Sequence, residues 1–142
     1  MRKRENNTII MGYYGTGKSV LASKSDDITE LVYDNNKPKS CHLVRALRNY
    51  DIILVDPHWR HILKDKGYQF HIVIPDETLK DEYMERFRDR YSRNEGSGSL
   101  AFIRAKEVEW NRLIAELKRT PCLSLTVLNK GQYISDVIEK FE

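Results

Sequence analysis

The sequence predicts a three-layer α/β/α protein, in which helices cover both faces of a central parallel sheet of about five strands. Short apolar runs alternate along the chain with segments of helical periodicity, and this alternation is typical of parallel sheets. The run Ile52–Val55 is wholly apolar between Asp51 and Asp56, as expected for a strand buried on both faces. The chain has 142 residues and no linker divides it, so we expect one domain over residues 1–142.

Local signals mark each element of the first half of the chain. An apolar run indicates a buried strand, and a polar residue before a periodic segment indicates a capped helix. In chain order we expect a strand at Thr8–Met11, which Gly12 ends; a short helix at Lys18–Lys24; a strand at Ile28–Tyr33, where β-rich residues alternate; a helix at Ser40–Asn49, which Ser40 can cap; and the strand at Ile52–Val55.

The second half contains two long amphipathic segments among its elements. One has apolar residues at every fourth position, which predicts a helix with its apolar stripe in the core. In chain order we expect a helix at Pro57–Lys66, with proline in its first turn; a strand at Tyr68–Ile74; a helix with the stripe Leu79, Tyr83, Phe87 and Tyr91; a helix at Leu100–Lys118 with Trp110 in the core; a strand at Cys122–Leu128; and a final helix from Gly131 through Ile138.

Composition and charge exclude several classes of protein. A mean hydropathy of −0.61 and the absence of a long apolar run exclude a transmembrane helix. No apolar segment follows the basic start, so no secretory signal is expected. Cys41 and Cys122 lie far apart, which fits a reduced cytoplasmic protein without a disulfide framework or zinc site. The net charge of +3 does not favour a nucleic-acid partner.

The most specific motif is the stretch from residue 12 to residue 19, which matches the P-loop pattern G-x-x-x-x-G-K-[ST]. Its glycines let backbone N–H groups turn toward a phosphate, and the following helix adds the positive end of its dipole. Lys18 is placed to contact the β- and γ-phosphates, and the Ser19 hydroxyl to ligate Mg²⁺. A chance glycine turn is the alternative, but the strand before and the helix after favour phosphate binding. The nucleotide-binding residues are therefore predicted to be Gly12, Tyr13, Tyr14, Gly15, Thr16, Gly17, Lys18, Ser19 and Val20.

Two carboxylates at predicted strand ends are candidates for the reaction. Asp56 follows an apolar strand, where a carboxylate can orient Mg²⁺, although Asp also caps a helix well at this position. Asp34 follows the second strand and is placed to hold the acceptor, although it also suits the turn-rich stretch after it. Tyr13, Tyr14 and Trp59 are candidates for stacking on a base, and the two tyrosines for walling the pocket instead.

Three arginines on one helix indicate a catalytic lid. Arg86, Arg90 and Arg93 share one face, and arginines on a closing flap can neutralise the charge of a transferring phosphoryl group. We expect the lid over about residues 84–104, with its hinge in the Gly/Ser patch 94–99. The alternative is a solvated face on which nearby acidic residues pair with the arginines, namely Glu82, Glu85 and Asp89.

The chain resembles the P-loop nucleoside and nucleotide kinases, in particular small adenylate-kinase-like proteins of phages and their bacterial hosts. The stretches that carry the resemblance are Ile10–Ser19, Tyr50–Val55, Leu79–Arg90 and Gly131–Ile138. It implies a P-loop NTPase fold that transfers the γ-phosphate of ATP, with Mg²⁺, to a nucleotide or nucleoside. It also implies that Lys18 and Ser19 lie at the phosphates and metal, that Arg86 and Arg90 are lid arginines, and that Asn129, Lys130 and Gly131 contact the adenine.

The sequence departs from this family in the acceptor region. The segment between Lys18 and Asp51 is short for a nucleotide-binding insert, and Asp34 is the best match to an expected acidic pair. The stretch Asp56–Arg60 stands where an Asp-Gly-Phe-Pro-Arg-like element is expected. The acceptor site is therefore expected to be reduced or unusual.

These observations together predict an ATP- and Mg²⁺-dependent phosphotransferase with a small-molecule nucleotide donor and acceptor. It would be cytoplasmic, in the host cytoplasm if a phage encodes it, and would need no membrane. One alternative is a nucleotide-binding regulatory or interaction protein that no longer catalyses transfer. Another is a polynucleotide 5′-end kinase that uses the basic residues Arg2–Arg4, which the nearly balanced charge disfavours. The oligomeric state follows from none of these patterns.

Overall fold

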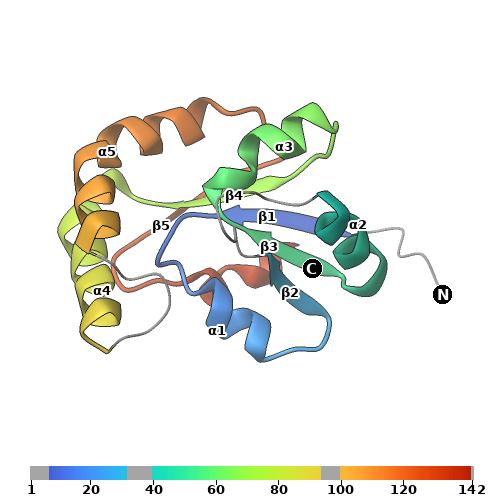
Figure 1. Ribbon diagram of the computed structural model, residues 1–142, viewed down its shortest axis with the longest axis horizontal. Helices are drawn as coiled ribbons and strands as arrows, with labels where there is room; N and C mark the ends of the chain where they lie inside the picture. Colours follow the sequence, from blue (N-terminus) through green and yellow to red (C-terminus); the bar gives the residue numbers. More distant parts are fainter. Residues whose placement is uncertain (1–6, 32–39, 94–99, 142) are drawn as a thin grey trace.

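The computed structural model describes residues 7–31, 40–93 and 100–141. Their centre is a sheet of five parallel strands in the order β2-β3-β1-β4-β5 (Figure 1). The strands are β1 (Thr8–Gly12), β2 (Ile28–Leu31), β3 (Ile52–Val55), β4 (His71–Pro75) and β5 (Leu125–Leu128). The predicted α/β class and parallel sheet are thus confirmed.

Strand β1 is the middle strand of the sheet and sets its register. Ile10 lies opposite Leu54 of β3 on one side and His71 of β4 on the other. The side chains of Ile9, Ile10 and Met11 are all buried, because helices cover both faces of the sheet. Since all five strands are parallel, the loops that follow them emerge at one edge of the sheet.

Helices and short 3₁₀ turns connect the strands. The longest described helix, α5, has 20 residues, yet no helix in the described ranges is both long and apolar enough to cross a membrane. The helices are α1 (Lys18–Ser23), α2 (Ser40–Asn49), α3 (Arg60–Asp65), α4 (Lys80–Ser92) and α5 (Leu100–Arg119), and the 3₁₀ turns are η1 (Pro57–Trp59), η2 (Glu77–Leu79), η3 (Ile134–Asp136) and η4 (Ile138–Phe141).

Two apolar clusters fill the space between the sheet and its covering helices. One face of the sheet packs against helices α2 to α5 through residues such as Leu43, Leu63 and Trp110. The other face packs against α1 and the C-terminal 3₁₀ turns through Leu21 and Phe141. Figure 1 shows α1 and α3 on opposite sides of the sheet, an arrangement compatible with the predicted three layers.

The connections of β1 run opposite to those of its neighbours. β1 leads to α1 on one face, whereas β3 and β4 lead to α3 and α4 on the other. Such a change of direction leaves a crevice at the carboxyl ends of the strands, which is where parallel sheets bind ligands. The loop of residues 12–19, called here the 12–19 loop, lies at this position because it directly follows β1.

The final helix expected from Gly131 is wrong, because the segment forms the 3₁₀ turns η3 and η4 instead. Gly131 has a φ of 75°, a left-handed conformation that does not start a helix. The Asp136 side chain accepts a hydrogen bond from the Tyr133 N–H, which caps the start of the 3₁₀ turn η3. The buried residues Ile134 and Val137 are three positions apart, as suits the tighter turn.

The prediction that Tyr91 belongs to the buried stripe of α4 is also wrong. Tyr83 and Phe87 are buried, but the side chain of Tyr91 is 44% exposed. An α-helix has about 3.6 residues per turn, so each step of four residues goes about 40° past a full turn. The repeat therefore drifts around the helix, and Tyr91 leaves the buried face. Trp110 is buried as predicted.

Candidate functional site

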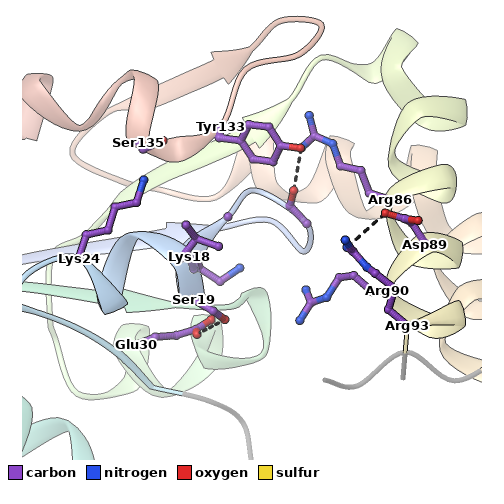
Figure 2. Close-up of a pocket in the computed structure, with 13 residues that line it drawn as sticks. Lys18, Ser19, Lys24, Glu30, Arg86, Asp89, Arg90, Arg93, Tyr133 and Ser135 are labelled. Carbon is purple, nitrogen blue, oxygen red and sulfur yellow. Dashed lines mark hydrogen bonds and ion pairs between the residues drawn. The ribbon is translucent and has the colours of Figure 1, made fainter. Parts of the chain in front are cut away.

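A pocket of about 540 Å³ lies between the 12–19 loop and helix α4 (Figure 2). Its size is in the range of small-ligand sites, which measure about 300–1,000 Å³. Five basic and two acidic side chains face it, so the pocket is electropositive and suits an anionic ligand. The lining residues are Gly15, Gly17, Lys18, Ser19, Val20, Lys24, Glu30, Arg86, Asp89, Arg90, Arg93, Tyr133 and Ser135.

Folding brings the predicted basic residues of two distant segments to this one pocket. Lys18 comes from the first turn of α1, and Arg86, Arg90 and Arg93 come from α4 and the residue after it. Figure 2 shows Arg90 and Arg93 pointing from α4 toward Lys18 and Ser19. The sequence predicted each of these two segments separately from its own residue pattern, and the structure brings them together.

The 12–19 loop is wrapped around the ammonium group of its own lysine. The Lys18 side chain donates to the Gly12 and Tyr13 carbonyls at 2.9 and 3.0 Å. The Thr16 hydroxyl donates to the same Tyr13 carbonyl at 2.7 Å. Gly17, with a φ of 88°, adopts the left-handed conformation that glycine tolerates best. The loop therefore carries a buried positive charge beneath its backbone.

The carbonyl groups of the loop are held by donors outside it. Gly15 O accepts from Arg86 at 2.7 Å, and Thr16 O accepts from the Ile134 N–H at 2.8 Å. Among bonds between described residues, the backbone N–H groups of Gly15, Gly17, Lys18 and Ser19 are not donors. All four residues line the pocket. A loop with held carbonyls and available N–H groups is suited to bind an anion.

Burial disturbs the titration of Lys18. Its side chain is only 7% exposed, and loss of water lowers its pKa to about 8. The positive charge of Arg90 lowers the pKa further, whereas the nearby carboxylates of Glu30 and Asp56 oppose the shift. An anion in the pocket would favour the charged form of Lys18.

Above about pH 8, the unfolding free energy of the wild-type protein is expected to rise with pH relative to that of the variant Lys18→Met. Between about pH 8 and 10 the unfolded chain, in which this lysine titrates near 10.5, binds more protons than the folded protein. A higher pH therefore favours the folded state, by at most about 1.4 kcal/mol per pH unit. Denaturant unfolding of both proteins from about pH 7 to 10 measures the difference. If the difference in unfolding free energy between the two proteins did not change with pH, Lys18 would not have the lowered pKa that its burial implies.

Glu30 is a site residue that the sequence reasoning missed. It lies in β2, and its carboxylate accepts a hydrogen bond from the Ser19 hydroxyl at 2.7 Å. The signal was present, since a charged residue interrupts the β-rich run Ile28–Leu31 close to its end. Asp34, which was predicted for this edge of the sheet, lies outside the described residues.

Asp56 caps the 3₁₀ turn that follows β3. Its carboxylate accepts from the His58 N–H at 2.9 Å, which confirms the capping interpretation. It does not line the pocket, but its charge acts on Lys18. The described ranges contain no group of three His, Cys, Asp or Glu side chains able to hold a metal by themselves.

The acidic residues of α4 pair with its arginines in part, as the alternative to a lid predicted. Glu82 contacts Arg86 at 2.9 Å, and Asp89 contacts Arg93 at 3.2 Å. Met84, Phe87 and Ile103 of the predicted lid region are buried in the core. The predicted hinge, residues 94–99, lies outside the described residues.

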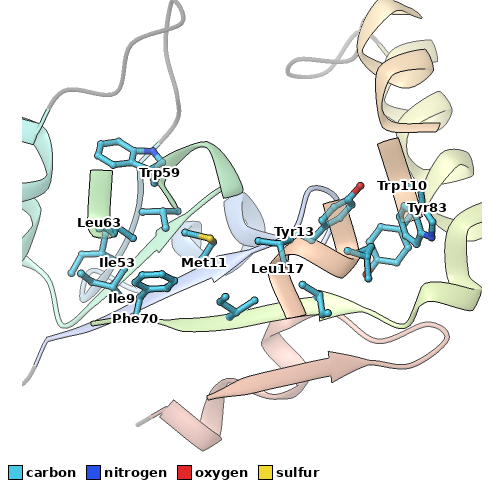
Figure 3. Packing of buried hydrophobic residues seen from close by; sticks show 14 of the residues in the cluster. Ile9, Met11, Tyr13, Ile53, Trp59, Leu63, Phe70, Tyr83, Trp110 and Leu117 are labelled. Atoms are coloured by element: carbon cyan, nitrogen blue, oxygen red, sulfur yellow. The ribbon is translucent and has the colours of Figure 1, made fainter. Parts of the chain in front are cut away.

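The prediction that Tyr13 and Trp59 stack on a base is wrong, because both side chains are buried. Tyr13 and Trp59 are 0% and 1% exposed. Tyr13 extends the alternation of β1, which places it on the core side with Ile9 and Met11. Figure 3 shows it near Trp110, with their ring centroids 5.4 Å apart. Tyr13 therefore contributes its carbonyl to the loop, and its ring to the core.

Tyr14 lies between two lysines at the start of the loop. Its ring is 4.2 Å from the Lys106 ammonium and 5.9 Å from that of Lys18. Its hydroxyl lies 2.8 Å from Nδ1 of His58. Lys106 is buried and pairs with Glu109 at 2.6 Å. Helix α5 therefore contacts the 12–19 loop through Lys106 and the Tyr14 ring.

The segment after β5 reaches the pocket through residues other than those predicted. Lys130 and Gly131 are exposed and do not line the pocket, whereas Tyr133 and Ser135 do. The Gly131 N–H donates to Glu82 of α4 at 3.2 Å. Tyr133 was missed because nothing in its local sequence distinguishes it from a surface tyrosine.

The comparisons with known proteins add no family to this description. No protein-family model matches the chain, and a search among curated proteins finds no match. The fold and the pocket define an α/β protein with an electropositive site where the loop after the central strand meets α4.

Gly15→Ala is expected to lower the unfolding free energy by about 2–4 kcal/mol, and Gly67→Ala by only about 1–2 kcal/mol. Both glycines have left-handed φ angles, 79° and 76°, so both substitutions strain the backbone. A Cβ at Gly15 would lie 3.0 Å from the buried Phe87 ring, whereas no described atom lies within 4 Å of a Cβ at Gly67. Urea unfolding measures both losses, and equal values would show that the ring moves aside freely.

Proposed function

We propose that this protein is an ATP- and Mg²⁺-dependent phosphotransferase, similar to small nucleoside monophosphate kinases, that transfers the γ-phosphate of ATP to a nucleotide or a similar small acceptor. The observation that carries the proposal is the convergence of Lys18 and Ser19 with Arg90 and Arg93 on one electropositive pocket, beside available loop N–H groups. Four residues of the P-loop pattern line this pocket, Gly15 and Gly17 to Ser19, together with Val20.

The 12–19 loop would bind the donor phosphates. Its N–H groups and the Lys18 ammonium supply hydrogen bonds and positive charge to the β- and γ-phosphates. Lys18 already lies buried against the Gly12 and Tyr13 carbonyls, so little rearrangement is needed to place its charge. This ordering before binding lowers the entropic cost of holding the phosphates.

The residues near Ser19 fit Mg²⁺ that is held jointly with a nucleotide. Mg²⁺ keeps several waters and needs only one or two protein oxygens besides the phosphates. The Ser19 hydroxyl and the Glu30 carboxylate are 2.7 Å apart at the pocket, and Asp56 lies near enough to affect Lys18. Ser19 and Glu30 would therefore hold the ion, which supplies positive charge to the phosphate oxygens, and Asp56 stays a predicted further ligand.

Arg90 and Arg93 would stabilise the charge that develops during transfer. The bond between the γ-phosphorus and the oxygen bridging to the β-phosphate breaks as an acceptor oxygen bonds to phosphorus, and ADP leaves. Catalysis of such a step depends on positioning and on electrostatic stabilisation. Arg90 of α4 and Arg93, the residue after this helix, line the pocket opposite Lys18. Asp34 stays the predicted contact for the acceptor, and Lys130 and Gly131 the predicted contacts for adenine.

The test is a thermal-shift screen with ATP, GTP and nucleoside monophosphates, followed by an assay of ADP formation with each acceptor. A ligand that binds only the folded protein must raise its apparent stability. Stabilisation by ATP with transfer to a small acceptor supports the kinase. Stabilisation without transfer to any acceptor indicates a binding protein, and transfer only to DNA or RNA ends, weakened steeply by salt, indicates an end-processing kinase. No stabilisation by any nucleotide overturns the proposal.

A further inference from the structure

Arg86 occupies a different environment from Arg93, another arginine of the pocket. Its side chain is 13% exposed, whereas that of Arg93 is 57% exposed. The guanidinium lies between two aromatic rings, 4.3 Å from the Tyr83 centroid and 4.1 Å from that of Tyr133. Stacking between rings holds a planar guanidinium in one orientation. Arg86 is therefore a fixed group in this structure.

The guanidinium of Arg86 joins three segments that are far apart in the sequence. It donates to the Gly15 carbonyl at 2.7 Å, to the Gln132 carbonyl at 3.3 Å and to Glu82 of its own helix at 2.9 Å. Glu82 completes the connection, because it also accepts from the Gly131 N–H at 3.2 Å. α4 thus fastens both the 12–19 loop and the segment after β5 through one ion pair.

The bond to Gly15 controls which way a flexible peptide group faces. The Gly15 carbonyl and the Thr16 N–H belong to one trans peptide and point in opposite directions, and the Thr16 N–H donates to the Tyr13 carbonyl at 3.3 Å. Glycine restricts this peptide little, since Gly15 has no Cβ and a φ of 79°. If the Gly15 carbonyl turned into the pocket, its partial negative charge would repel a phosphate. The hydrogen bond from Arg86, at 2.7 Å, holds that carbonyl on a positive charge instead.

We propose that Arg86 is a positioning residue, which holds the Gly15 carbonyl and so keeps its partial negative charge away from a phosphate bound by the N–H groups of the 12–19 loop, while Arg90 is the arginine that contacts the ligand. The inference rests on the proposed function and changes the role expected of Arg86 as a lid arginine. An arginine that closed over the phosphates would have to leave Gly15, Gln132 and both rings.

Arg86→Lys separates the two roles, because lysine keeps the charge but not the flat, forked guanidinium. The readout is the amide NMR signal of Gly15 in the ligand-free protein. Labelling with ¹³C-carbonyl tyrosine and ¹⁵N-glycine selects this signal, since Tyr14–Gly15 is the one Tyr-Gly pair in the sequence. We expect Arg86→Lys to move the Gly15 signal and to weaken binding of inorganic tripolyphosphate about tenfold, as measured by calorimetry.

Two matched variants on the same helix are the controls. Arg90→Lys should leave the Gly15 signal in place and weaken tripolyphosphate binding less than Arg86→Lys does. Arg88→Lys should change neither, because Arg88 is exposed and pairs with Glu85. An unmoved Gly15 signal in folded Arg86→Lys overturns the proposal. If that variant does not fold, Tyr133→Leu, which removes one of the two rings, must move the signal, and an unmoved signal there overturns it equally. Wild-type protein that binds no tripolyphosphate would count against the proposed function, while the Gly15 signal still decides the role of Arg86.

Discussion

Replacement of Lys18 by methionine is expected to reduce phosphoryl transfer from ATP by about three orders of magnitude while the fold is retained. Lys18 is the buried cation of the 12–19 loop, bonded to the Gly12 and Tyr13 carbonyls. Methionine fills nearly the same volume but cannot neutralise the charge of the β- and γ-phosphates. A steady-state assay of ADP formation at saturating ATP measures the loss.

The stability of the Lys18→Met variant should stay within about 1 kcal/mol of the wild type at neutral pH. The Tyr13 carbonyl keeps its bond from the Thr16 hydroxyl, so mainly the Gly12 carbonyl loses a partner. That loss is offset because a charged group no longer has to be buried. Lys24→Met is the matched control, since Lys24 lines the same pocket but is exposed, and its transfer rate should fall far less. A wild-type rate in Lys18→Met would refute the phosphate-binding role.

Arg90→Ala is expected to lower kcat by about two to three orders of magnitude, with a much smaller change in the KM for ATP. Arg90 lines the pocket opposite Lys18 and acts on its charge. A group that neutralises charge developing only during transfer affects turnover more than binding. Initial rates over a range of ATP concentrations separate the two constants.

Arg88→Ala is the control for Arg90→Ala, because it removes an exposed arginine from the same helix without touching the pocket. Its kcat and KM should equal those of the wild type. If Arg90→Ala instead raised the KM and left kcat unchanged, Arg90 would contribute only to binding the donor. The proposed contact with the transferring group would then be wrong.

Features set by neighbouring residues could be predicted from the sequence. The strand Ile52–Val55 matches its predicted bounds, because an uninterrupted apolar run is stable only when buried. The 12–19 loop was predicted because its glycines, lysine and serine stand at the fixed spacing of one pattern within eight residues. The error at Gly131 has the same local origin, since an apolar pattern was followed past a glycine whose φ is positive.

The sequence by itself determined the α/β class, the parallel sheet and the loop after β1, since these depend on local apolar patterns and on turns that glycine permits. Only the tertiary structure decided which distant groups meet that loop. Arg86 reaches Gly15 across 71 positions, and Tyr133 approaches Gly17 closely enough to meet a Cβ at 3.0 Å. Such contacts depend on how α4 and the segment after β5 pack around the sheet. No spacing within either segment encodes these contacts, so the positions of Glu30, Tyr133 and Arg86 at the pocket are visible only in the folded chain.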